Sequence, residues 1–284
     1  MCLRTFKRVN RLTRATFLDF NLGNRSFRVM AERTVQLVLH YDGSGFSGWQ
    51  RQPERRTVQG IVEQSLEKLC GAPVAALGSG RTDSGVHARG QAVGVRVPDK
   101  WSSEVLRRAL NAVLPGDVWV ASAFEMRPGF HARFSATARR YSYHVGTDDA
   151  AHSPFRRALE YPFGFRIDRA ALDSAAVALV GEHSFRAFAV KDTAPEGDEH
   201  RCRVQVARWD ERAGGLVFVI EANRFLHHMV RFLVGTMLDV ASGRRPLTDI
   251  AQLLVAADNH GVSAPAPARG LFLDAVTYPR ELYA

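Results

Sequence analysis

The chain has 284 residues, of which 46% are hydrophobic and 24% charged, a globular composition with enough length for two core-sized units. Its formal net charge is +9, which suggests an acidic partner such as nucleic acid, but residues 1–30 hold seven basic side chains and one acidic side chain. Bulk charge is therefore a weak argument for nucleic acid. The leading segment lacks a signal-peptide core, and no apolar run is long enough to span a bilayer.

The start of the chain and its cysteines carry two further expectations. Strand patterning begins directly after Met30, so residues 1–30 are interpreted as a basic N-terminal extension. We favour either a disordered arm or a mis-assigned start over an arginine-rich transit segment. Three scattered cysteines argue against a disulfide framework and against a cysteine-based zinc site, and they fit a reducing compartment. The sequence therefore predicts a cytoplasmic protein.

The first part of the chain alternates predicted strands and helices. Its predicted strands are residues 34–43, 73–77, 91–97 and a strand that begins at residue 117. Thr57 caps a helix that ends at Gly71, and Ser102 or Ser103 caps a helix that stops at Pro115. The resulting order is β-α-β-β-α-β, which is the ferredoxin-like unit.

The second part of the chain can be interpreted in the same way. Its predicted strands are residues 139–146, 202–210, 216–224 and 271–279. Its predicted helices are residues 169–180, 225–240 and 247–256. We therefore predict an α+β fold with two ferredoxin-like β-α-β-β-α-β halves, residues 31–136 and 137–284, whose antiparallel sheets meet at a basic catalytic cleft.

The stretch GSGRTDSGVHARG, residues 78–90, is the strongest local signal in the chain. Its glycine spacing matches neither a Rossmann fingerprint nor a Walker A loop, and it is longer than a hairpin connection needs. Long connections of this kind often carry function. Arg81 favours the ionised form of Asp83, which makes Asp83 a candidate nucleophile. His87 is either a general base or a hydrogen-bonding or RNA-contacting group.

Other chemistries lack the residues that they need. A glycosidase requires a second carboxylate near Asp83, and a Ser/His/Asp hydrolase would show a G-x-S-x-G motif, but the sequence offers neither. For a metal site, Asp83 and His87 are too few. His227 and His228 are adjacent on a predicted helix, where their side chains would point about 100° apart. We therefore expect no metal.

Two stretches interleave arginine with aromatic residues, as nucleic-acid-binding surfaces do. FHARFSATARRYSY contains Arg133, Arg139 and Arg140, and GFSGWQRQPERRT contains Arg51. A core strand with a solvated basic face explains the first stretch equally well.

The predicted helix at residues 225–240 is mostly apolar, but it carries His228 and Arg231 three residues apart, so both side chains can share one edge. An arginine in so apolar a helix requires an anionic partner. Either Asp83 or Asp239 can supply that anion.

Taken together, these motifs resemble those of the tRNA pseudouridine synthase A family over about residues 31–280. The motifs are YDGSGFSGWQRQ, GSGRTDSGVHARGQ, NAVLPGDV, FHARFSATARRYSY, NRFLHHMVRFLVG and GLFLDAVTYP, in the family's order. The resemblance implies an isomerase that converts uridine to pseudouridine in the anticodon stem-loop of tRNA, at family positions 38, 39 and 40, through an aspartate nucleophile and base flipping. It further implies a homodimer that needs no cofactor.

The resemblance also implies roles for individual residues. Asp83 would be the catalytic nucleophile, and Arg81 would displace and hold the flipped uridine. Tyr141 would stack on the target base, and Arg231 would pair with Asp83. The basic side chains expected to contact RNA are Arg51, His87, Arg89, Arg133, Arg139, Arg140 and His228.

Two rival readings come from other classes of protein. A non-catalytic RNA-recognition motif shares the β-α-β-β-α-β order, but its aromatic residues would lie on the strand at residues 91–97, which has none. A hydrolase that uses Asp83 lacks its second catalytic group. The sequence leaves open whether Asp83 attacks C1′ or the uracil ring, and whether Tyr141 removes the C5 proton.

Overall fold

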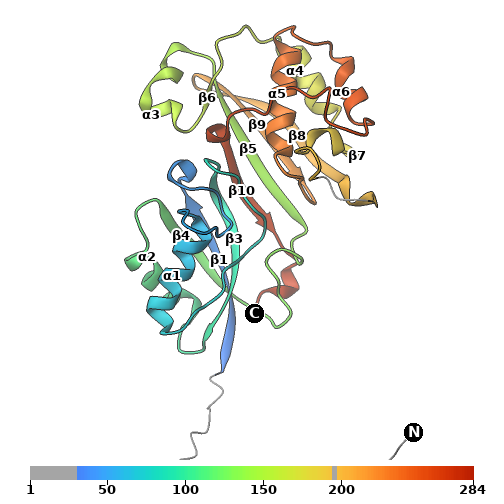
Figure 1. The fold of residues 1–284 in the computed structure, drawn as a ribbon. Coiled ribbons are helices and arrows are strands. Elements are labelled where there is room, and N and C mark those ends of the chain that lie inside the picture. The colour runs from blue at the N-terminus through green and yellow to red at the C-terminus, as the bar shows by residue number, and fades with distance from the viewer. Residues whose placement is uncertain (1–30, 194–196) are drawn as a thin grey trace, which may run out of the picture. The chain divides into compact units, whose positions relative to one another are not determined.

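The computed structural model describes residues 31–193 and 197–284 (Figure 1). The extension predicted for residues 1–30 lies outside these ranges. No helix within the described residues is both long enough and apolar enough to cross a membrane.

One mixed sheet runs through the described part of the chain, with ten strands in the order β4-β1-β3-β10-β5-β9-β8-β7, β2 beside β3 and β6 beside β5. The strands are β1 Glu32–Tyr41, β2 Leu77–Gly78, β3 His87–Pro98, β4 Val118–Met126, β5 Ala138–Gly146, β6 Tyr161–Pro162, β7 Gly181–Ser184, β8 Arg201–Arg212, β9 Gly215–Ala222 and β10 Leu271–Thr277. Neighbouring strands are antiparallel except at two pairs, β10 with β3 and β5 with β6.

Two groups of helices lie along the sheet, α1 and α2 near β1, β3 and β4, and α4 to α6 near β8 and β9 (Figure 1). The helices are α1 Val58–Cys70, α2 Ser103–Val113, α3 Pro154–Arg157, α4 Arg169–Val177, α5 Met229–Ala241 and α6 Thr248–Leu253. The predicted ends of α1 are confirmed, because the Thr57 hydroxyl accepts a hydrogen bond from the Gly60 N–H and Gly71 closes the helix at φ 76°. Ser102 caps α2 in the same way.

The core lies mainly on the helix side of the sheet, and a smaller cluster covers the other side. Val93 belongs to the large core, whereas Ala92 packs with Phe130 and Tyr278 in the small one. Successive side chains of a strand point to opposite faces, so the loop that carries Phe130 covers the face of β3 away from the helices. This packing fixes the segment that leads into β5.

The parallel pairing of β10 with β3 joins the strands from the first part of the chain to the strands from its second part. It places Phe272 opposite His87 and Leu273 opposite Ala88, directly after the loop that carries Asp83. At Gly90 a β-carbon would lie 2.2 Å from the Asp274 carbonyl oxygen, so only glycine allows β10 to approach this closely. The Asp83 loop is therefore held where the two parts of the sheet meet.

The structure corrects several predicted element boundaries. Residues 73–76 form no strand, because the side chains of Glu63 and Gln59 on α1 hydrogen-bond the Ala76 N–H and carbonyl. Residues 87–90, expected in the loop, belong to β3. The helix expected from residue 225 begins at Met229. The sequence also gave no expectation of α3, β6 or β7.

Candidate active site

The loop that carries Asp83 runs from Ser79 to Val86, between β2 and β3. The side chain of Gln91 on β3 holds its start: it accepts a hydrogen bond from the Ser79 hydroxyl at 2.8 Å and donates to the Gly80 carbonyl at 2.9 Å. Both Ser79 and Gln91 are buried, so these hydrogen bonds are shielded from water.

A second set of contacts holds the residue next to the carboxylate. The hydroxyls of Tyr41 and Thr82 lie 2.8 Å apart, and the Trp49 N–H donates to the Thr82 carbonyl at 3.0 Å. Gly48 has φ 87°, and a β-carbon there would lie 2.7 Å from the same carbonyl oxygen. The many polar and glycine residues around Asp83 thus fix its position on all sides.

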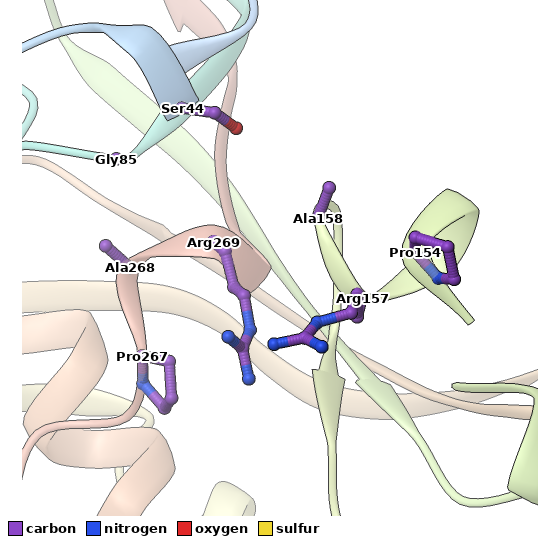
Figure 2. A pocket seen from close by; sticks show the side chains of 8 residues that line it. All are labelled: Ser44, Gly85, Pro154, Arg157, Ala158, Pro267, Ala268 and Arg269. Carbon is purple, nitrogen blue, oxygen red and sulfur yellow. The ribbon is translucent and has the colours of Figure 1, made fainter. Parts of the chain in front are cut away.

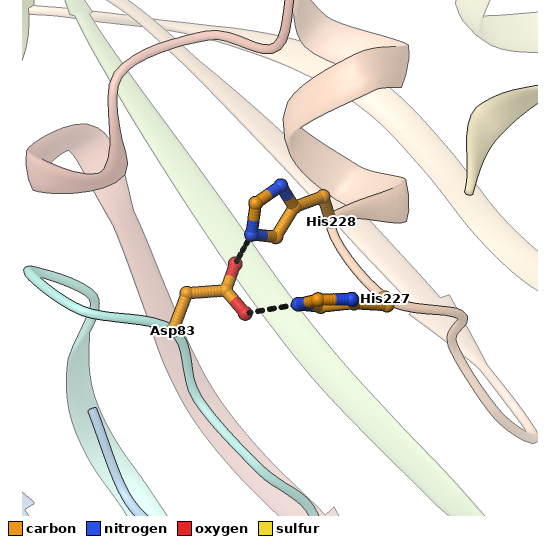
Figure 3. Close-up of side chains that lie close together, drawn as sticks. All are labelled: Asp83, His227 and His228. Atoms are coloured by element: carbon orange, nitrogen blue, oxygen red, sulfur yellow. Dashed lines mark ion pairs between the residues drawn. The ribbon is translucent and has the colours of Figure 1, made fainter. Parts of the chain in front are cut away.

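Three nitrogen-containing side chains face the Asp83 carboxylate. The distances are 3.3 Å to His228 Nε2, 3.7 Å to His227 Nε2 and 3.4 Å to Arg231 Nη1. Figure 3 shows the two imidazole rings converging on the carboxylate from residues that precede α5. The Asp83 side chain is 19% exposed, so it is largely enclosed but still accessible to solvent.

The convergence of the two histidines corrects the expectation that they point about 100° apart on a helix. His228 adopts the left-handed conformation, with φ 61°, and serves as the N-cap of α5. A non-glycine residue in this region is uncommon and often marks a functional site. The turn at His228 brings His227 and His228 to the same carboxylate.

Arg231 lies on the first turn of α5 and has two acceptors. Its Nε donates to the Ala266 carbonyl at 2.8 Å, while Nη1 reaches Asp83. The other anion weighed from the sequence, Asp239, pairs instead with Arg244 at 2.7 Å. The predicted contact between Arg231 and Asp83 is therefore present in the structure.

The electrostatics of the site keep His228 neutral near pH 7. Burial lowers the pKa of the His228 imidazole, and the charges of Arg231 and His227 lower it further, although Asp83 opposes them. A neutral imidazole has one N–H donor and one acceptor nitrogen. His228 can therefore orient the carboxylate with a hydrogen bond without neutralising its charge.

Tyr141 lies on β5 beside this site and is 9% exposed. Its ring makes an edge-to-face contact with Phe225, with the ring centroids 5.0 Å apart. Burial raises the pKa of the Tyr141 hydroxyl, and the negative charge of Asp83 raises it further. Tyr141 therefore offers a flat apolar ring and an uncharged phenol next to the carboxylate.

The same cluster provides three atoms that are typical metal ligands. One atom each of Asp83, His227 and His228 lies within 4.8 Å of the others. However, the Arg231 guanidinium already occupies the neighbourhood of the carboxylate, and a metal cation there would be repelled by its charge. The set fits an ion pair with Arg231 better than it fits a metal.

The other basic residues expected at the site lie away from the carboxylate or at its rim. Within the described residues, Arg81 is exposed and makes no ion pair with Asp83. Arg51 pairs with Glu63 at 3.3 Å and Arg140 pairs with Glu221 at 2.7 Å. Arg133 is exposed and lies over the Phe134 ring.

Arg139, expected to contact RNA, instead hydrogen-bonds four backbone carbonyls. Nη1 donates to Ala136 at 3.1 Å and Asn223 at 2.8 Å, and Nη2 donates to Ser79 at 3.1 Å and Arg133 at 2.7 Å. These acceptors belong to the Asp83 loop, to the segment before β5 and to the end of β9. Arg139 thus joins three segments and has few donors left for a phosphate.

Replacing Arg139 with glutamine is expected to lower the free energy of unfolding by about 2–4 kcal/mol, because it leaves carbonyls of three segments, two of them in part-buried hydrogen bonds, without their donor. The melting temperature should fall by roughly 5–12 °C for a chain of this size. The matched control is Arg140→Gln, which removes an exposed ion pair worth about 1 kcal/mol or less. Equal melting temperatures for the two variants would contradict the structural role of Arg139.

His87 and Arg89 lie on β3 and form a separate cluster around Phe272 of β10. His87 is 1% exposed, accepts a hydrogen bond from the Gly43 N–H and stacks on Phe272, with the ring centroids 4.7 Å apart. Arg89 packs over the same ring and lies 3.6 Å from Asp274. The buried ring of His87 therefore supports β3 and β10 and does not face Asp83.

Acidification is expected to destabilise the fold through this cluster. Burial lowers the pKa of His144 to about 4, and Arg89 adds to the shift; burial lowers the pKa of His87 as well. An unfolded histidine takes up its proton near pH 6.5, so between about pH 6.5 and 4 the unfolded state binds more protons. The contribution of these histidines to the free energy of unfolding should be complete above about pH 6.5 and should decrease as the pH falls toward 4. Urea titrations at several pH values across this range measure the free energy of unfolding. If this free energy depended on pH in His144→Gln as it does in the wild type, the prediction would be contradicted.

Sequence reasoning missed two residues of the site. His227 was set aside because the helix was expected to start too early, and Phe225 was treated as a core residue of that helix. The signal for both was the HH pair directly before an apolar helix, since a turn there brings adjacent side chains to one point.

Comparison with known proteins adds an independent finding. The profile of the tRNA pseudouridine synthase family matches residues 37–135 and 175–279. The chain is similar to the tRNA pseudouridine synthase A of Shewanella sp. strain MR-7, with 41% identity over 256 residues, 87% of this chain and 94% of the relative. It is also similar to those of Limosilactobacillus fermentum, with 38% identity over 86% and 95% of the two chains, and Geobacter sp. strain M21, with 36% over 87% and 99%.

Proposed function

The chain belongs to the tRNA pseudouridine synthase family, and from that premise we propose that it modifies uridines of the anticodon stem-loop with Asp83 as the nucleophile. As a member of the family it is an isomerase that converts uridine in tRNA to pseudouridine. The finer assignments, which are the position in tRNA, the nucleophile and base flipping, are proposals.

The observation that supports Asp83 most directly is its environment. It is a single carboxylate, largely enclosed, faced by Arg231 and two imidazoles, in a loop that is hydrogen-bonded at Ser79, Gly80 and Thr82. An ionised carboxylate fixed in this way is prepared for covalent catalysis. No second carboxylate is needed, because the reaction neither adds water nor transfers electrons to another molecule.

In the proposed reaction, the bonds that break and the bonds that form in the product all belong to the same uridine. The bond between N1 and C1′ of the uridine breaks, the uracil turns, and C5 forms a new bond to C1′. The proton on C5 leaves to solvent and N1 gains one, so substrate and product are isomers. Asp83 forms a transient covalent bond either to C1′ or to the uracil ring, and it is released at the end.

The target base must leave its stack before Asp83 can reach it. Flipping a nucleotide costs a few kcal/mol, which stacking on a protein aromatic ring can offset. Tyr141 is the aromatic ring beside Asp83, and its neutral hydroxyl can donate a hydrogen bond to the uracil. Arg81 is exposed at the start of the loop and is proposed to hold the flipped uridine.

The proposed position in tRNA is tested with unmodified transcripts that carry uridine at family positions 38, 39 or 40. Carbodiimide labelling followed by reverse transcription maps each pseudouridine that the enzyme makes. We expect modification at these positions and none in transcripts where cytidine replaces them. Pseudouridine found only outside the anticodon stem-loop would refute the proposed position while leaving the activity intact.

We also propose that the fold consists of two ferredoxin-like halves, residues 31–136 and 137–284. The strand orders β4-β1-β3-β2 and β10-β5-β9-β8 support this, because each matches the order of a β-α-β-β-α-β unit. The division of the chain at residue 136, and the separate extension at residues 1–30, stay predictions.

The assembly and location are proposed from the resemblance to the family. We propose a homodimer in the cytoplasm, where its tRNA substrate is made. Large apolar side chains such as Phe155, 90% exposed, and Phe134, 77% exposed, are available for a partner surface. Light scattering of the purified chain tests the dimer.

A further inference from the structure

A cleft of about 610 Å³ lies next to the Asp83 loop, and none of the residues proposed to take part in the reaction lines it. Gly85, two residues after Asp83, lines it, together with α3 and the segment that precedes β10 (Figure 2). The charged residues that line the cleft are Arg157 and Arg269, and no acidic residue of the described chain lines it.

The two arginines have no counter-charge in the described part of the chain. Figure 2 shows both guanidinium groups extending into the cleft toward one another, although the residues are 112 positions apart in the sequence. Neither guanidinium makes an ion pair or a hydrogen bond with the described residues, and the Nε of Arg269 is buried without a partner. Two like charges that converge without a carboxylate indicate a site for an anion.

The cleft and the proposed catalytic site share a wall. The Ala266 carbonyl accepts a hydrogen bond from Arg231, which faces Asp83, and the next residues, 267–269, line the cleft. On the opposite side, a β-carbon at Gly85 would lie 3.4 Å from the Ala268 β-carbon. An anion between the arginines would therefore lie just beyond the wall that holds the carboxylate.

We propose that Arg157 and Arg269 bind one backbone phosphate of the tRNA, close to the flipped nucleotide. The proposal rests on the proposed function, because tRNA brings a chain of phosphates continuous with the uridine that reaches Asp83. Two planar guanidinium groups match the oxygens of a phosphodiester, and contacts to the backbone position a nucleic acid without reading its sequence. The cleft would thus fix the strand while the base turns.

The test is the double variant Arg157→Met/Arg269→Met, which removes both charges and keeps an unbranched, flexible side chain. We expect the Kd for unmodified tRNA to rise roughly tenfold near 0.1 M salt, and the slope of log K against log salt to become shallower by about one. The KM for tRNA should rise and kcat should change little. Arg96→Met is the matched control, because Arg96 is an exposed arginine on β3, about 30 Å from the His87 end of the strand.

A second arm identifies the ligand as a backbone phosphate. Neutral methylphosphonate linkages are placed one at a time around the target uridine of an anticodon stem-loop RNA. We expect one linkage to weaken binding to the wild type and to have no further effect on the double variant. If no linkage does so, but millimolar inorganic phosphate protects the cleft arginines from chemical modification, the site binds a free anion and the proposal is wrong.

The outcomes separate this proposal from the proposed function. If the wild type turns over and the double variant has the same Kd and the same salt slope as the wild type, the phosphate contact alone is overturned. Absence of turnover in the wild type would overturn the proposed function, while the salt slope would still decide whether the cleft binds RNA. The single variant Arg157→Met guards against misfolding, because the Arg157 side chain is exposed and makes no hydrogen bond with the described residues.

Discussion

Replacing Asp83 with alanine is expected to abolish pseudouridine formation while leaving the affinity for tRNA within about tenfold. Because Asp83 is the proposed nucleophile, the loss in kcat should reach roughly 10⁴-fold or more. Binding should persist because the proposed phosphate contacts come from arginines elsewhere on the surface. Single-turnover product formation and filter binding with the same tRNA measure the two effects separately.

Asp83→Asn is the sharper version of this experiment. The amide keeps the size of the side chain and can still contact His228 and Arg231, but it is not a nucleophile. Asp239→Asn serves as the control, because it neutralises a carboxylate that pairs only with Arg244 on the described chain. If Asp83→Asn loses tRNA binding in parallel with turnover, the carboxylate is needed for binding and a purely catalytic role is refuted.

Replacing Tyr141 with leucine is expected to reduce kcat/KM roughly 100-fold while the protein stays folded. The ring of Tyr141 is the flat surface on which the flipped base is proposed to stack, and leucine cannot replace a stacking interaction. Because the ring is 9% exposed and contacts Phe225, some loss of stability is also expected. Circular dichroism and thermal melting check that the fold persists.

Tyr141→Phe then separates the ring from the hydroxyl. Phenylalanine retains stacking, so tRNA affinity should stay close to that of the wild type, and the loss should appear mainly in kcat. The raised pKa of the Tyr141 hydroxyl keeps it protonated at neutral pH, which disfavours a phenolate as the base for the C5 proton and favours a hydrogen-bonding role. The control is Tyr278→Phe, which removes another buried hydroxyl, one that donates to Ala132.

Two outcomes would contradict this account of Tyr141. Wild-type activity in Tyr141→Leu would show that the base does not stack on this ring. A melted circular dichroism spectrum for the same variant would make Tyr141 a structural residue instead. Full activity in Tyr141→Phe would remove only the hydroxyl from the mechanism.

Much of the sheet and of its helices follows from local signals in the sequence. The helix α1 was predicted with both ends because Thr57 and Gly71 cap it through their own side chain and backbone freedom, which no distant contact alters. The strand predicted at residues 73–77 overlaps β2 only at Leu77, because side chains of α1 satisfy the backbone of Ala76, which then needs no strand partner. Local patterns predict elements whose hydrogen bonds are local.

In the candidate site, too, some features follow from local signals in the sequence and others depend on contacts that the sequence does not show. The length and composition of the Asp83 loop marked it, and an arginine within an apolar helix required an anion. Chemistry left Asp83 and Asp239 open as that anion, and only the family resemblance pointed to Asp83, which Arg231 contacts in the structure. The approach of His227 and His228 depends on a single left-handed residue, which no periodicity reveals. Arg139 was assigned to RNA because the sequence does not show the four carbonyls that surround it.

The central claim, that this chain makes pseudouridine through Asp83, is tested most directly by the release of tritium from tRNA labelled at C5 of uridine, with no cofactor added. We predict that the wild type releases tritium and that Asp83→Ala and Asp83→Asn do not, although all three bind the tRNA. Release by either variant at the wild-type rate would contradict the role of Asp83. Absence of release by the wild type, despite binding, would contradict the activity itself.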